Sequence, residues 1–335
     1  MPTGPDDGRT IVALGDVPRT NGGDTRTRRE EARDLYTQGR YTLTQGQFDP
    51  EIHRRALELF HQSAERDPSF APAYAGMADV FNHADDPARA KAAALRAISL
   101  DSSLAEGYTA LAYVLANYEY RWAEADSALR RAIRLNPRYV LAHLRRANEL
   151  AAQGRHDEAA TEVERAREIQ PESFVVLLNR GFMAQLAGRL DEAIARFQEA
   201  HELEPRRIDA RHMLAHAYWA QGRYDAAQGV MRSIGSNAGV RAMSGNPDTM
   251  AVIAPLLASS SHPDSISHAA AIYVRLGRRA EAFEVLERMY ERRHKHLAML
   301  LQHQQFAPLR DDPRFLRLRR KLNLPVDAST VGSVP

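Results

Sequence analysis

The stretch that decides the fold is GRHDEA at residues 154–159, which returns as GRLDEA at 188–193 and as GRYDAA at 222–227. Each copy begins 34 residues after the previous one. The glycine suits a helix that ends in a left-handed residue. The position after the arginine varies as His156, Leu190 and Tyr224, so the hexapeptide carries no shared chemistry. A turn that recurs at this interval predicts a repeat architecture built from helices.

Outward from these turns, an alanine followed four residues later by another apolar residue recurs along most of the chain. Successive alanines lie 34 or 35 residues apart until a final interval of 55. Each unit predicts two amphipathic helices, such as 140–153 and a second one capped by Asp157 and stopped by Pro171. The pairs are Ala56/Phe60, Ala90/Ala94, Ala125/Leu129, Ala159/Val163, Ala193/Phe197, Ala227/Met231 and Ala282/Leu286.

The pattern resembles the tetratricopeptide repeat (TPR) family. An early aromatic in the first helix is present as Tyr74 and Tyr108, but later units carry His143, Leu177 and Arg211 there. The resemblance implies an all-α, right-handed solenoid of about seven helix–turn–helix repeats with a C-terminal capping helix. The layout, which ends in FAPLRDDPRFLRLRRKLNLP, also resembles the C-terminal TPR region of bacterial transcriptional regulators, adenylate cyclases and Ser/Thr kinases, without their effector domain.

The repeat pattern also divides the chain. Residues 1–25 and 326–335 are expected to be disordered tails, because the first is rich in Gly, Asp, Thr and Pro. Six units are expected over 26–235, and a seventh unit with its cap over 263–325. Between them, residues 236–262 are expected to form an irregular linker or a degenerate repeat.

Composition excludes several classes of function. The 335 residues include no cysteine and carry a formal net charge of +2, so neither thiolate chemistry nor a strong global field is available. No phosphate-binding, nucleophile-elbow or kinase motif occurs, and no run of apolar residues is long enough to span a membrane. We expect a cytoplasmic, non-catalytic protein without a cofactor.

The resemblance implies that the first helix of each unit lines a concave groove. The groove positions of units four and five are apolar at their centre and have a polar rim, which favours a protein or peptide partner. Asn148 and Asn179 match the asparagines of the family's carboxylate clamp, but Leu144, Asp209 and Met213 replace its basic residues, so that clamp is not expected. The alternative is a groove filled by the chain itself. The predicted groove residues are Tyr113, Leu144, Asn148, Leu178, Asn179, Phe182, Asp209, His212, His216 and Trp219.

Two other functions stay open as alternatives. His212 and His216 lie one helical turn apart and, with nearby acids such as Asp209, define a candidate metal or enzymatic site. No third ligand can be assigned, so no metal is expected. From Arg275 to Lys321 the chain holds 13 Lys and Arg against 6 Asp and Glu, a basic end that could serve a nucleic-acid-associated regulator. Binding of nucleic acid is not expected, because few aromatic side chains accompany these cations.

Overall fold

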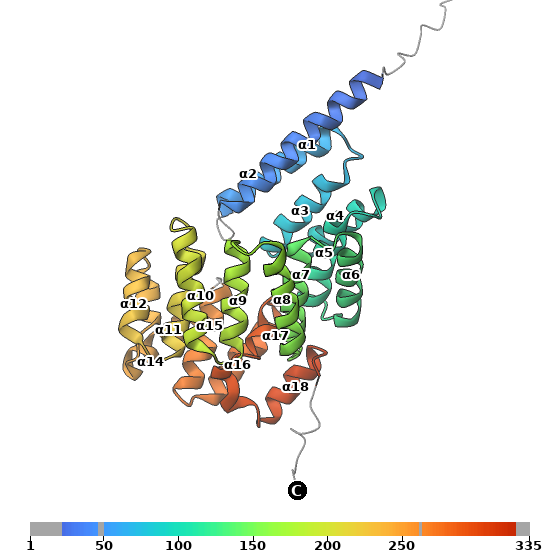
Figure 1. Cartoon of the computed structure of the whole chain (residues 1–335). Coiled ribbons are helices and arrows are strands. Elements are labelled where there is room, and N and C mark those ends of the chain that lie inside the picture. The colour runs from blue at the N-terminus through green and yellow to red at the C-terminus, as the bar shows by residue number, and fades with distance from the viewer. Residues whose placement is uncertain (1–21, 46–49, 261–262, 326–335) are drawn as a thin grey trace, which may run out of the picture.

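The computed structural model describes residues 22–45, 50–260 and 263–325, and within these ranges it contains helices and no strand. The predicted all-α solenoid is confirmed (Figure 1). Six helix pairs form units one to six: α1 (Gly22–Thr44) with α2 (Pro50–Arg66), α3 (Ala71–His83) with α4 (Pro87–Leu100), α5 (Ala105–Asn117) with α6 (Trp122–Leu135), α7 (Val140–Ala152) with α8 (His156–Ile169), α9 (Phe174–Leu186) with α10 (Leu190–Leu203), and α11 (Asp209–Ala220) with α12 (Tyr224–Ser233).

The corner between the two helices of a unit is built as the hexapeptide predicts. Gly154 has a φ of 83°, and the N–H of Arg155 donates to the Leu150 carbonyl at 2.9 Å, which closes the end of α7. Asp157, expected as the cap of the second helix, lies instead in the first turn of α8, whose cap position is Arg155. At this position its carboxylate interacts favourably with the positive, N-terminal end of the helix dipole.

Small residues let the helices of a pair approach closely. A methyl group added at Gly181 of α9 would stand 2.5 Å from the Phe197 ring of α10, so only glycine fits beside that ring. Early in the first helix, the polar head of Tyr74, Tyr108 or His143 reaches the carbonyl oxygen six residues earlier, at 3.0 to 3.2 Å. His143 therefore keeps the contact that the aromatic residue makes in the other two units.

The stack curves toward its first helices. In order along the chain, α1, α3, α5, α7, α9 and α11 each pack against the next, whereas no comparable packing joins successive second helices in the described ranges. The first helices are therefore closer together and form the inner face, as expected for a solenoid of helix pairs.

The C-terminal part departs from the simple stack. Residues 236–262 were expected to be a linker or a degenerate repeat, and their described part forms two helices, α13 (Asn237–Ala242) and α14 (Pro247–Ala258). Helix α14 packs along α15 (Pro263–Arg275), and α15 packs along α16 (Arg279–Glu291). The last described elements are α17 (Leu297–Leu300), the 3-10 helix η1 (Gln304–Leu309) and α18 (Pro313–Lys321).

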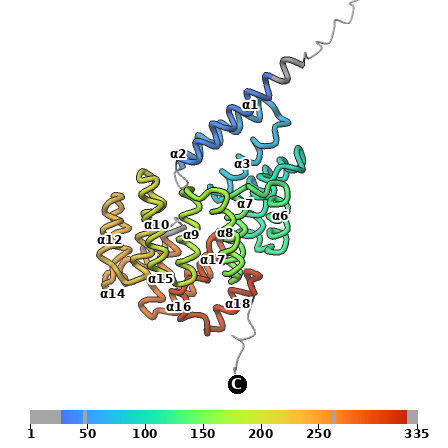
Figure 2. The backbone as a smooth tube through the Cα atoms, in the orientation of Figure 1, coloured from blue at the N-terminus to red at the C-terminus, as the bar shows by residue number. Residues whose placement is uncertain are grey.

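The N-terminal boundary also differs from the expectation. Helix α1 begins at Gly22, so residues 22–25 of the predicted tail are helical. Residues 1–21 and 326–335 lie outside the described residues. Figure 2 shows the backbone turning back after α14 and running behind the row of α10, α9 and α8 toward the α6 end.

Candidate functional site

The first helices carry the ten predicted groove residues on α5, α7, α9 and α11. Three of them are buried: Leu144 is 2% exposed, Asp209 3% and Trp219 2%. The expectation that these three face a partner therefore needs correction, because neighbouring parts of the chain already cover them. The other seven are half-buried: Tyr113, Asn148, Leu178, Asn179, Phe182, His212 and His216.

The cover comes largely from the chain's own C-terminal end. We call α15–α18, together with the following residues to Leu324, the C-terminal clasp. Helix α17 packs along α7, and Met299 of α17 contacts the apolar cluster that contains Leu144. The His303 ring lies 5.7 Å from the Phe182 ring of α9. The clasp therefore occupies part of the groove, which is the alternative of self-occupation left open by the sequence.

The clasp also reaches the C-terminal ends of the first helices. These ends hold carbonyl groups without a partner in their own helix, and the helix dipole favours donors and cations there. Side chains of the clasp donate to such carbonyls in units two, three and four, and in unit six to the Trp219 carbonyl, which also accepts the N–H of Gly222 at 3.0 Å. The donors and acceptors are Lys295 Nζ to His83 O at 3.1 Å, Arg293 Nη1 to Tyr118 O at 3.1 Å, Gln302 Nε2 to Ala152 O at 2.7 Å, and Arg275 Nη1 to Trp219 O at 3.2 Å.

The two predicted histidines of unit six lie beside an imidazole that the sequence did not single out. His268 of α15 lies 5.3 Å from His216 and 4.7 Å from Trp219, measured between ring centroids. Its Nε2 lies 2.8 Å from the Ala242 carbonyl oxygen and therefore carries the proton. Burial lowers the pKa of His268, although the bond to Ala242 opposes the shift. This arrangement is an aromatic contact between unit six and the clasp.

Asp209 has a positioning role in the same unit. Its Oδ2 accepts a hydrogen bond from Arg207 Nε at 2.9 Å, and the Arg207 guanidinium lies over the Phe174 ring at 3.9 Å. Across the described ranges, no group of three or more His, Asp or Glu side chains is arranged to hold a metal ion. The metal alternative thus receives no support from geometry.

The two asparagines behave differently from each other. Asn179 Nδ2 donates to the Val175 carbonyl of its own helix at 2.9 Å, so that donor is already used. Asn148 Oδ1 is buried and has no hydrogen-bond partner among the described residues. An unsatisfied buried acceptor is costly, which makes Asn148 the better ligand-binding candidate of the two.

The inner face of the N-terminal units holds a charged network that sequence reasoning missed. Asp79 of α3 is 5% exposed and accepts from Arg40 Nη1 and from Arg145 Nη2, each at 2.8 Å. Arg145 also donates to the Thr109 carbonyl at 3.0 Å and covers the Tyr113 ring at 4.8 Å. Burial alone would raise the pKa of Asp79, but Arg145 and Arg40 outweigh it and hold this pKa below its usual value. Tyr113 is consequently engaged by an internal cation.

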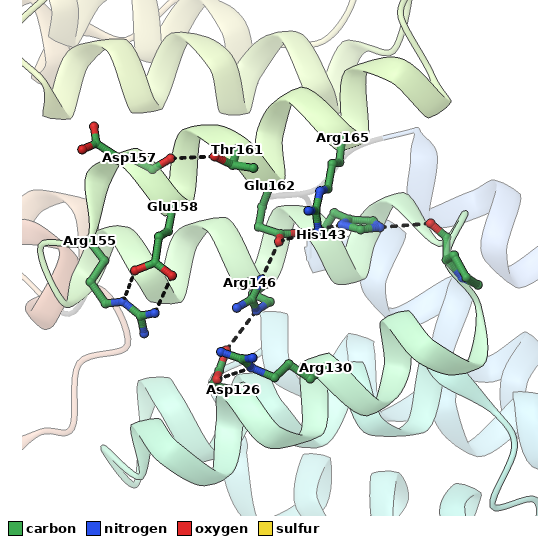
Figure 3. A network of polar contacts seen from close by, with 11 residues as sticks. Asp126, Arg130, His143, Arg146, Arg155, Asp157, Glu158, Thr161, Glu162 and Arg165 are labelled. Carbon is green, nitrogen blue, oxygen red and sulfur yellow. Dashed lines mark hydrogen bonds and ion pairs between the residues drawn. The ribbon is translucent and has the colours of Figure 1, made fainter.

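A second polar cluster joins units three and four (Figure 3). His143 Nδ1 lies 2.6 Å from Glu162 Oε2, and its Nε2 lies 3.0 Å from the Pro137 carbonyl. Both neighbours are acceptors, so the protonated ring can donate to each of them, and the hydrogen bond to Glu162 raises the pKa of His143. Arg146 bridges Glu162 to Asp126 of α6. The cluster is a structural joint between the two halves of the array.

Comparison with known proteins agrees with this architecture. Residues 118–174 and 184–239 each match a family model described as tetratricopeptide repeat. No curated protein matches the chain in sequence. Among the described helices, none combines the length and the apolar character that crossing a bilayer requires.

Several solved structures are similar in fold. A thermophilic TPR protein of Thermus thermophilus is 23% identical, with 56% of this chain and 98% of that chain covered and a TM-score of 0.48. The type IV pilus biogenesis factor PilW is 19% identical, with 64% and 93% covered and a TM-score of 0.46. YrrB, a TPR protein with an unusual peptide-binding site, is 23% identical, with 57% and 95% covered and a TM-score of 0.34. Together with the 34-residue period and the helix pairs, the two family matches support membership of the tetratricopeptide repeat family.

Proposed function

We propose that this protein is a non-catalytic scaffold that binds a protein or peptide segment in the groove of units four to six. TPR proteins bind protein or peptide partners, and stacked helix pairs present extended concave surfaces for that purpose. We place this activity in a regulatory or scaffolding role in the bacterial cytoplasm. No specific observation favours the histidine site or the basic C-terminal end as the main functional site.

The observation that carries the proposal is a juxtaposition on the inner face of α7 and α9. Leu178 and Phe182 are apolar, lie one turn apart on α9 and remain half-buried. In the neighbouring unit, Asn148 Oδ1 is a buried acceptor without a partner among the described residues. A peptide could bury an apolar side chain against Leu178 and donate a backbone N–H to Asn148. This would cover the exposed apolar surface and give Asn148 Oδ1 a hydrogen-bond partner.

The test compares two leucine variants in partner capture from the native cell. Leu178→Asp places a charge in the groove, and Leu203→Asp places the same charge on α10, where the leucine is already 45% exposed. We expect Leu178→Asp to weaken a captured partner's affinity about tenfold or more, because a carboxylate would be desolvated in the contact. Leu203→Asp should bind as the unmodified chain does. If Leu178→Asp keeps every partner at unchanged affinity, the groove is not the binding site.

A further inference from the structure

Glu149 of α7 is a buried acid to which the proposed groove assigns no role. The residue is 5% exposed, and neither of its carboxyl oxygens has a hydrogen-bond partner among the described residues. A carboxylate that is buried and ionised without a partner is very costly, so burial favours the neutral, protonated acid. The charges around Glu149 therefore decide whether it is ionised in the folded chain.

The two arginines of α7 lie one turn before Glu149 but are engaged elsewhere. Arg145 belongs to the network around Asp79, to which it donates at 2.8 Å. Arg146 bridges one acid of α6 and one acid of α8. Because neither guanidinium donates a hydrogen bond to Glu149, their charges favour its ionised form only from a distance.

The helices that pack most extensively on α7 are α8 and α6, and each contributes an acid. Asp126 of α6 is half-buried and acts on Glu149 through its charge, and Glu162 of α8 is 2% exposed. The other charged side chains of these two helices are exposed or paired within their own helix. Burial raises the pKa of Glu149 well above its usual value, and the charge of Asp126 adds to this rise. The two arginines of α7 oppose the rise without cancelling it.

The other three helices packed on α7 are α5, α9 and α17, and they bring no compensating charge to Glu149. In α5, Glu106 lies in the first turn, and the Tyr113 ring is covered by an arginine of α7. In α9, Arg180 Nε lies 3.5 Å from an oxygen of Glu164. Helix α17, with the sequence LAML, carries no ionisable side chain. Within the described helices, an ionised Glu149 would therefore be a buried charge without a direct partner.

We propose that Glu149 makes the joint between units three and four sensitive to pH: the neutral acid allows α7 to pack on α6, and ionisation of Glu149 weakens that packing. The inference goes beyond the proposed function and needs no partner. It still bears on the groove, because α7 also carries Leu144 and Asn148.

The direction of the pH dependence follows from the proton that Glu149 holds in each state. Below a pH of about 4.5, the usual pKa of a glutamate, the acid is protonated in the folded and in the unfolded chain. Above that pH the unfolded chain loses the proton first, so rising pH favours unfolding until Glu149 also ionises in the folded chain. The contribution of His143 to the same joint begins only near pH 6.5. Between pH 5 and pH 6 the two residues can therefore be separated.

The test compares the full chain with Glu149→Gln, which cannot ionise. Urea unfolding is measured from pH 5 to pH 9 and followed by tryptophan emission, because Trp122 of α6 is 7% exposed and donates from Nε1 to the Leu322 carbonyl at 2.8 Å. The unfolding equilibrium constant of the unmodified chain is divided by that of the variant, which cancels the titrating groups that both chains share. We expect this ratio to rise about tenfold from pH 5 to pH 6, because the two states differ by one proton. It should level off where Glu149 ionises in the folded chain.

Two further variants control the comparison. Glu149→Met also cannot ionise and should give the same rise with pH, whatever its effect on stability at pH 5. Glu168→Gln removes an exposed acid of α8 and should give a ratio that stays constant over the same range.

Two results would overturn the inference. A ratio that is constant from pH 5 to pH 9 for both Glu149 variants would show that the acid is ionised equally in the folded and unfolded chains. A ratio that falls with rising pH would show that the fold stabilises the carboxylate. Neither result depends on partner capture, so the proposed function can fail in Leu178→Asp while the pH-sensitive joint stands, and the reverse.

Discussion

The inner faces of units one to three and of units four to six are built on the same backbone but are held by different forces. In the first half, the ninth position of α3 is Asp79, a buried carboxylate between Arg40 of α1 and Arg145, which reaches it from α7 of unit four. In the second half, the inner face presents Leu144 and Phe182 and is partly covered by the clasp. The helix-pairing residues fix the scaffold and leave the chemistry of the groove free to differ. The inner face is therefore held by ion pairing in one half and by apolar burial in the other, whereas buried apolar clusters lie between the helices in both.

The largest effect is expected from Asp79→Ala in the charged half. Removal of this carboxylate would leave the buried Arg145 guanidinium and the half-buried Arg40 guanidinium without their shared partner, at a cost of about 4 kcal/mol in the free energy of unfolding. Urea unfolding followed by circular dichroism measures the change. Asp34→Ala, at an exposed acid of α1, is the control and should cost at most about 0.5 kcal/mol. A loss below about 1 kcal/mol in Asp79→Ala would contradict a network on which the fold depends.

A somewhat smaller effect is expected from Leu144→Ala in the apolar half. Deleting a leucine that is 2% exposed should cost about 3 kcal/mol, from lost burial and the cavity that remains. Leu95→Ala serves as its control, because Leu95 is already 47% exposed. Chemical unfolding at low and at high salt sharpens the comparison. The loss in the free energy of unfolding caused by Leu144→Ala should be the same at both salt concentrations, because salt screens charges and not apolar contacts. A strong salt dependence of this loss would show that apolar burial does not hold this inner face.

The smallest effect concerns the joint between the halves and depends on pH. The pKa of His143 is raised in the folded protein, so the protonated ring contributes stability that is present below the unfolded pKa of about 6.5. This contribution is lost as the pH rises through the folded pKa. His143→Tyr keeps the aromatic that units two and three use but cannot hold the proton. Its stability deficit should be largest, about 1 kcal/mol, near pH 6 and should shrink toward pH 9.

Urea unfolding at several pH values checks the His143 prediction. Glu162→Gln is the companion variant. It should remove the same pH dependence of stability, because it deletes the carboxylate that raises the pKa of His143. A deficit of His143→Tyr that grows with pH would mean that the ring is neutral in the folded protein.

The sequence predicts the structural features that depend on residues close together in the chain. The glycine corners, the period and the helix pairs follow from local conformation and from apolar spacing, so Gly154 and the helices on either side of it lie as expected. Errors are of one or a few residues where local signals compete, as with Asp157, which is the second residue of α8 and lies two positions after the cap residue Arg155. Residues 236–260 were harder, because an irregular linker or a degenerate repeat was expected there, and α14 forms a continuous helix in spite of Pro255.

The candidate site was less predictable because it depends on contacts between distant residues. Arg145 donates to Asp79, which lies 66 residues away in the sequence, and no pattern in either helix predicts this contact. Buried Leu144 and Trp219 were assigned to an open groove because the position of the clasp follows from no local signal. One signal was present: unit two has Asp85 and unit three has Tyr120 where later corners have glycine. A costly residue at a position that usually favours glycine would have marked these corners as a contact surface.

The junction of Trp122 with Leu322 spans 200 residues and that of His83 with Lys295 spans 212. In an open array each unit touches only its neighbours, so the ends fray independently and folding spreads locally. A bridge from unit two to the last helices closes a long loop, which couples the two ends and slows the folding rate. During synthesis, the corners of units two and three emerge long before the residues that cover them, and they stay exposed to solvent until α16 to α18 have been made.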